Sequence, residues 1–149
     1  MALVRGWRAR APRRAAERAA AAPDDKVRAF VDAIATEAEA RPHFPPIWFR
    51  EIAEGGTHLD ASTLASISAV ITSLRHILRE GCASGRFHKV NPLLVHAGIV
   101  GPILLYFASG SLRRRLERGG VAGAAMVSRD QLVAHVQRLS LMALEGHTA

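Results

Sequence analysis

The sequence predicts an all-α fold, a multi-helix bundle. Three observations favour it: aromatic residues make up only 5% of the chain, alanine and leucine are abundant, and apolar residues recur at helical spacing without sustained strand-like alternation. Hydrophobic residues account for 49% and charged residues for 22%, so the chain should fold rather than stay disordered. A length of 149 residues suits a single domain with a core of its own.

Positive charge is concentrated at the start of the chain. Residues 1–22 contain six arginines and one acidic residue, and the whole chain has a net charge of +7. We predict a basic connecting helix over 1–22 and a separate domain over 23–149. A basic helix can attract nucleic acid or an anionic membrane, although an arginine-rich helix is more often simply solvated.

Start signals place the next helices. Pro23, followed by two acidic residues, begins a helix expected to run to about residue 40, and a proline-rich break then precedes a short helix that ends at Gly55-Gly56. Asp60 is the predicted N-cap of a helix that continues to about Ala83. A capping box, Ser-Arg-Asp-Gln at 128–131, opens a last helix through residue 144.

A junction with the pattern E-G-x-x-x-G-x-F-x-x-V-N-P at residues 80–92 separates two long helices. Gly81 and Gly85 are expected to supply the left-handed backbone that a helix end needs. Asn91 is expected to cap the following helix, with Pro92 at its first position, where the missing N–H costs nothing.

The helix predicted over 92–116 is apolar on nearly all sides and should be buried on nearly all sides. One small protomer cannot easily surround it, so a second face should meet another protein or a membrane. Residues 92–112 carry no formal charge and are just long enough to span a bilayer. His96, Gly98, Gly101 and Pro102 within that stretch argue against a span, and Pro102 could kink the helix. We favour a buried dimer helix and expect no membrane partner.

Motifs for catalysis are missing. The chain has no glycine-rich phosphate loop, no H-E-x-x-H, no C-x-x-C and no G-x-S-x-G. Cys82 is the single cysteine, which excludes an internal disulfide and fits a reducing cytosol. The seven histidines form no i, i+4 pair, and Glu51 and Glu54 could share a helix face that looks exposed. We therefore expect no enzymatic activity, no catalytic residue, no cofactor and no metal site.

The junction, the segment W-F-R-E-I-A-E-G-G at 48–56 and the order of the helices together resemble the C-terminal effector-binding and dimerisation domain of TetR/AcrR-type transcriptional regulators. The resemblance implies a homodimer in which the two long helices 92–116 and 128–144 pack against those of the partner as a four-helix bundle. It also implies a cytoplasmic regulator, a repressor, whose small and mostly apolar effector controls DNA binding. No segment here resembles a helix-turn-helix, so DNA would be bound only through an N-terminal domain missing from this chain.

The resemblance also implies candidate site residues, although an apolar residue at helical spacing usually belongs to the plain core. The candidates for the ligand pocket are Phe30, Ile34, Trp48, Ile52, Ile71, Leu74, His96, Val100 and Phe107, of which Trp48 and His96 rank first. The candidates for the dimer interface are Val95, Ile99, Tyr106, Leu132, Val136 and Leu139.

A second function stays open, that of a small basic helical interaction protein whose arginine-rich first helix contacts nucleic acid or anionic membrane. The two hypotheses differ in salt dependence. A dimer held by apolar contacts is insensitive to salt, whereas binding through arginines to phosphates weakens steeply as salt is added.

Overall fold

The structure, a computed structural model, describes residues 21–146 and is all-helical over that range, as predicted. The described helices are α2 (Pro23–Ala40), α3 (Phe44–Ala53), α4 (Ala61–Ala83), α5 (Pro92–Ala108), α6 (Gly110–Arg118) and α7 (Arg129–Glu145). The connecting helix predicted over 1–22 lies outside the described residues, except for residues 21 and 22, which are not helical.

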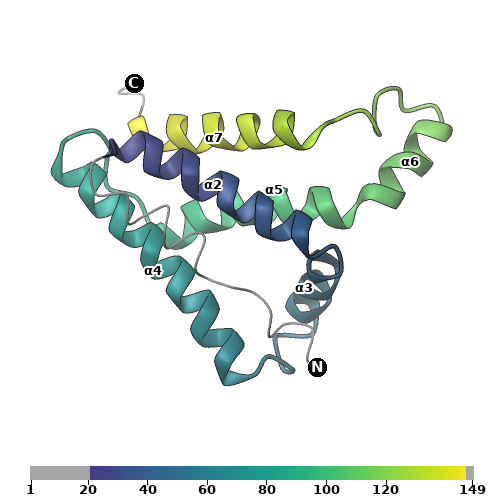
Figure 1. Ribbon diagram of the computed structural model, residues 1–149, viewed down its shortest axis with the longest axis horizontal. Helices are drawn as coiled ribbons and strands as arrows, with labels where there is room; N and C mark the ends of the chain where they lie inside the picture. Colours follow the sequence, from purple (N-terminus) through teal and green to yellow (C-terminus); the bar gives the residue numbers. More distant parts are fainter. Residues whose placement is uncertain (1–20, 147–149) are drawn as a thin grey trace.

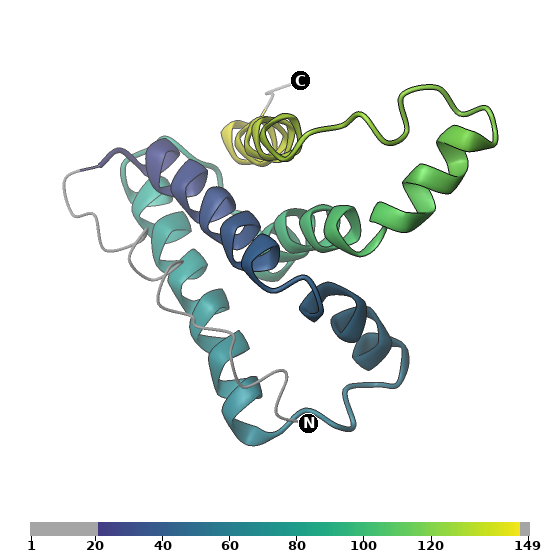
Figure 2. The same cartoon turned by 45° about the vertical axis from the view of Figure 1, so that its right-hand side comes forward.

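Helix α2 is the central element of the bundle. It packs against α4, α5 and α7, while α5 also packs against α7, α4 and α3. Both views show α5 and α7 as neighbouring helices, with α4 descending on the opposite side from α6 (Figures 1 and 2). Helix α6 and the loop 119–128 project away from the bundle (Figure 1). The core therefore lies where α2, α4, α5 and α7 meet.

The centre of the core is formed by aliphatic side chains and one phenylalanine that are less than 2% exposed. Burying such a side chain contributes about 1.5–3 kcal/mol relative to leaving it exposed. The largest of these side chains are Phe30, Ile34, Leu74, Ile77, Ile99, Ile103, Leu104, Leu144, Val27, Val31 and Val136.

The predicted helix starts are confirmed. The Asp60 side chain accepts a hydrogen bond from the backbone N–H of Thr63 at 2.8 Å, and the Asn91 side chain accepts one from the N–H of Leu93 at 2.9 Å. Ser128 and Gln131 exchange the two bonds of a capping box, at 3.2 Å and 2.8 Å. Each cap satisfies a backbone donor that the first helical turn leaves free.

The junction after α4 confirms one glycine prediction and corrects the other. Gly85 has a φ of +74°. The N–H of Arg86 bonds to the carbonyl of Gly81 at 2.9 Å and that of Gly85 to the carbonyl of Cys82 at 3.1 Å, which is a Schellman motif. Gly81, by contrast, lies inside α4 without a positive φ. A Cβ there would sit 1.9 Å from Cδ2 of Phe87, so Gly81 is needed for space.

Charged side chains tie the ends of three helices together at this junction. Arg86 donates to both carboxylate oxygens of Asp24, at the start of α2, and to Glu145, at the end of α7. The hydrogen bonds from Arg86 hold the pKa of Asp24 below its usual range. Nearby, Lys26 is buried and contacts Glu80 of α4 at 2.5 Å. These contacts fix the junction against α2 and α7.

The single helix predicted over 92–116 is wrong, because the chain breaks at Ser109. Helices α5 and α6 meet at 62° across this break. The turn is held by the Arg113 guanidinium, which lies 3.9 Å from the Tyr106 ring centroid and donates to the Tyr106 carbonyl at 3.3 Å. Tyr106 in turn donates from its hydroxyl to the carbonyl of Val127 at 2.8 Å.

The break also bears on the membrane alternative. Helix α5 has 17 residues, which is about 25 Å of helix, shorter than the roughly 30 Å of a bilayer core. Among the described helices, α4 alone is long and apolar enough by itself to cross a membrane. Helices α5 and α6 reach that length only together, as a bent pair. The core helix of a soluble protein can be equally long and apolar, so the length and composition of α4 are weak support for a membrane segment.

Candidate functional site

An apolar cavity of about 220 Å³ lies between α3 and α5. It is lined by Trp48, Phe49, Ile52, His96, Ala97, Val100, Gly101 and Leu104. A smaller cavity of about 30 Å³ shares four of these residues and adds Phe44 of α3. It extends the lining to α2 through Ile34 and to α4 through Ile67 and Val70. The two cavities form one candidate site at the meeting of α2, α3, α4 and α5.

The local sequence explains how each wall is placed. A proline in the first turn of α3 fixes the start of this short helix, and Trp48 stacks on Phe44 with ring centroids 5.9 Å apart. On α5, His96, Val100 and Leu104 are spaced at i, i+4 and i+8, so they form one stripe facing the cavity. The walls are thus one aromatic helix and one apolar helix with a single imidazole.

His96 is the one titratable residue among those that line the cavity. Burial lowers the pKa of its imidazole, so the ring is neutral at pH 7. Within residues 21–146 the ring forms no hydrogen bond or ion pair. A neutral imidazole has one N–H donor and one acceptor nitrogen, and neither is used by another described residue.

The structure brings together five of the nine pocket candidates. Ile34, Trp48, Ile52, His96 and Val100 border the two cavities. Phe30 and Leu74 are completely buried in the core, and Ile71 and Phe107, both half-buried, border neither cavity. Sequence reasoning missed Phe44, Phe49, Ile67, Val70, Ala97, Gly101 and Leu104. The i, i+4, i+8 spacing from His96 was the signal for Leu104.

The dimer candidates are scattered over different environments. Ile99 and Val136 are enclosed by the protomer's own core and are not available to a partner. Val95, Tyr106 and Leu132 are half-buried, and Leu139 is exposed. Because α5 is apolar on all sides, its periodicity could not tell the face that packs inward from the face that points outward. The exposed apolar residues of these helices that were missed include Leu94, Leu105 and Met142.

The family described as the tetracyclin repressor-like C-terminal domain matches residues 23–136. The chain belongs to this family. Neither a curated protein nor a solved structure matches the chain. Domains of this TetR-like family are regulatory rather than enzymatic, and they generally dimerise and bind small-molecule effectors.

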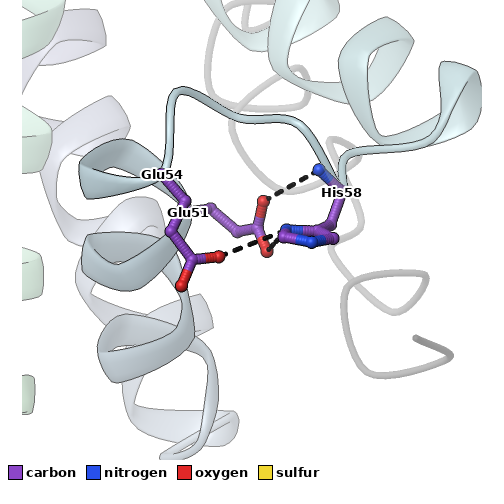
Figure 3. A group of neighbouring side chains, drawn as sticks. All are labelled: Glu51, Glu54 and His58. Carbon is purple, nitrogen blue, oxygen red and sulfur yellow. Dashed lines mark hydrogen bonds and ion pairs between the residues drawn. The ribbon is translucent and has the colours of Figure 1, made fainter.

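The TetR-like domain also holds a group of side chains that sequence reasoning missed. Glu51 and Glu54, at the end of α3, meet His58 from the turn that leads to α4 (Figure 3). Nδ1 of His58 lies 3.3 Å from Oε1 of Glu51 and 3.3 Å from Oε2 of Glu54. The histidines form no i, i+4 pair on one helix, whereas here a turn brings one histidine back to two glutamates.

Proposed function

We propose that this TetR-like domain senses a small, mostly apolar effector in the cavity between α3 and α5 and forms a homodimer. Binding of the effector in the cavity controls DNA binding by a separate helix-turn-helix domain. The whole regulator thereby acts as a repressor in the cytoplasm. The observation that carries the proposal is the apolar cavity of about 220 Å³ with one imidazole that has no partner among the described residues.

The size and lining of the cavity define the effector class. Sites for drug-sized ligands usually enclose about 300–1,000 Å³, so this cavity fits a smaller molecule. Apolar walls favour a hydrocarbon body, and the neutral His96 ring favours one hydroxyl, carbonyl or amine on it. A charged effector would have to lose its hydration without a charged partner among the lining residues, which is costly.

The position of the cavity also suggests how occupancy is transmitted. Helix α5 forms one wall of the cavity and packs against α7. A molecule that binds better to one spacing of α3 and α5 shifts the population toward that spacing. In this proposal the shift moves α5 and α7 together, because they are packed side by side, and changes the distance between the two DNA-binding domains of the dimer.

The experiment is calorimetric titration with the straight-chain alcohols from 1-butanol to 1-decanol. These probes combine one hydroxyl with a body of graded length. We expect affinity to increase by about 0.8 kcal/mol for each buried CH₂ group until the cavity is full, and then to level off.

Gly101→Leu provides the blocked variant, because Gly101 borders the cavity and an added Cβ there meets no atom within 4 Å. Its affinity for the best alcohol should fall at least tenfold. Gly110→Leu adds the same side chain on α6, away from the cavity, and should bind as the wild type does. Equal binding by both variants, or no saturable binding of any alcohol, would contradict the proposed site.

A further inference from the structure

We propose that Glu51, Glu54 and His58 form a binding site for a divalent transition-metal ion of the Zn²⁺ class. The site lies at the C-terminal end of α3, and its three ligand atoms are within 4.8 Å of one another. It is separate from the apolar cavity, so the proposal does not depend on the effector.

Two glycines form the turn that brings the histidine into the group. Gly55 and Gly56 have φ values of +75° and +72°, which other residues rarely adopt. The N–H of Gly56 bonds to the carbonyl of Glu51 at 2.7 Å, and the N–H of Gly55 to that of Ile52 at 3.1 Å. The backbone therefore reverses in a fixed turn, and His58 returns over the last turn of α3 (Figure 3).

The distances from the histidine nitrogen to the two carboxylates fit a metal ion. Ligand atoms held about 2.0–2.1 Å from a tetrahedral Zn²⁺ are about 3.3–3.4 Å apart. Nδ1 of His58 lies at 3.3 Å from one oxygen of each glutamate. Charge-assisted hydrogen bonds between nitrogen and oxygen are shorter, about 2.7–2.9 Å, and a single N–H cannot point at both oxygens.

The second oxygen of each carboxylate is already used, which orients the first. Oε2 of Glu51 accepts from the backbone N–H of His58 at 3.3 Å, and Oε1 of Glu54 accepts from Nε of Arg50 at 2.9 Å. Outer contacts of this kind hold ligands in place at metal sites. Each glutamate therefore turns its remaining oxygen toward the histidine nitrogen.

The charge of Glu51 also favours a cation at this place. The Glu51 side chain is only 5% exposed, and no lysine or arginine in residues 21–146 forms an ion pair with it. A buried carboxylate is costly unless it is paired or binds a metal. The single ion-pair partner of Glu51 in this range is His58, whose side chain is 51% exposed and so leaves an access route from solvent. One imidazole nitrogen and two carboxylate oxygens suit Zn²⁺, with water in the fourth position.

Zn²⁺ titration of the full chain, followed by calorimetry and thermal unfolding, tests the proposal. We expect binding of one Zn²⁺ at this site and an increase in the midpoint of unfolding. Co²⁺ should reproduce the binding with the visible absorption of a four-coordinate ion. Mg²⁺ should have no effect at the same concentration, because it requires near-octahedral oxygen ligation.

Three variants distinguish this site from surface histidines. His58→Ala changes an exposed residue, so it should fold normally and lose Zn²⁺ affinity at least tenfold. Glu54→Gln should also weaken binding. His76→Ala is the matched control, because His76 lies 3.5 Å from Glu80 on α4 as a pair without a third donor. Its Zn²⁺ affinity should equal that of the wild type.

Two results would overturn the proposal. Equal Zn²⁺ affinity of His58→Ala and wild type would assign the binding to other groups on the surface. No binding at millimolar Zn²⁺ would reduce the group to polar contacts between one histidine and two glutamates.

Discussion

At the residue scale, Gly81 shows why a correct motif can carry an incorrect physical reason. The sequence indicated a glycine-rich helix end, and two glycines were expected to be left-handed. Only Gly85 has a left-handed backbone, while Gly81 leaves space for the Phe87 ring against α4. Helix-end glycines and contact glycines look alike in a sequence, because the contact depends on where a later residue folds back.

We expect Gly81→Ala to destabilise the domain by about 1–3 kcal/mol, the usual cost of overpacking a filled site. Its Cβ would sit 1.9 Å from the Phe87 ring. Urea unfolding measures the change. Combining it with Phe87→Leu should cost less than the sum of the two single variants, because the smaller side chain relieves the clash.

Gly98→Ala is the matched control for that measurement. Gly98 also lies inside a helix, and a Cβ there meets no atom within 4 Å. It should stabilise the domain by about 0.5–1 kcal/mol, because alanine loses less backbone entropy than glycine in a helix. A loss of stability of the same size in both variants would mean that helix disturbance, rather than the Phe87 contact, explains Gly81.

At the element scale, the sequence predicted helix starts well and one helix end poorly. The caps at Asp60, Asn91 and Ser128 depend on side chains adjacent to the helix in the sequence, so local reasoning found them. The break at Ser109 depends on Arg113 lying over Tyr106 and on the Tyr106 hydroxyl reaching Val127. Contacts between residues up to twenty or so positions apart are not visible in helical periodicity.

The capping box of α7 gives a prediction at this scale. Ser128→Ala removes the hydroxyl that accepts from the Gln131 N–H and should reduce the free energy of unfolding by about 1 kcal/mol. Ser66→Ala is the control, because Ser66 lies within α4 and bonds back to the carbonyl of Ser62. Alanine is the better helix former there, so urea unfolding should find no loss. Equal losses in both variants would exclude the cap as the cause.

At the scale of the whole molecule, the candidate site was also predicted only where the signal lies within one helix. The sequence identified the aromatic residue of α3 and the imidazole of α5 because each stands out within its own helix. It could not separate cavity from core for Phe30 or Leu74, since both positions are apolar and differ only in how four helices meet. The Glu51–His58 contact was missed for a related reason, because a glycine turn and not a helix repeat creates it.

At the scale of the whole molecule, the homodimer stays a prediction, and the exposed apolar side chains of α5 and α7 indicate where a partner would bind. Leu94 and Leu105 are 71% and 58% exposed on α5, and Leu139 and Met142 are about half exposed on the neighbouring α7. Leu94 and Leu105 are eleven residues apart, which places them on one face of α5. Apolar side chains that remain exposed on two packed helices are typical of an interface with a partner.

Leu94→Glu places a charge at this face and should raise the dissociation constant of the homodimer at least tenfold, because the carboxylate would be buried without a partner. Leu64→Glu is the control, since Leu64 is 52% exposed on α4, away from the proposed interface. Sedimentation equilibrium at low and high salt measures both. An apolar interface predicts a wild-type dimer that persists at high salt. A monomeric wild type, or equal dissociation of the two variants, would show that α5 and α7 do not form the interface.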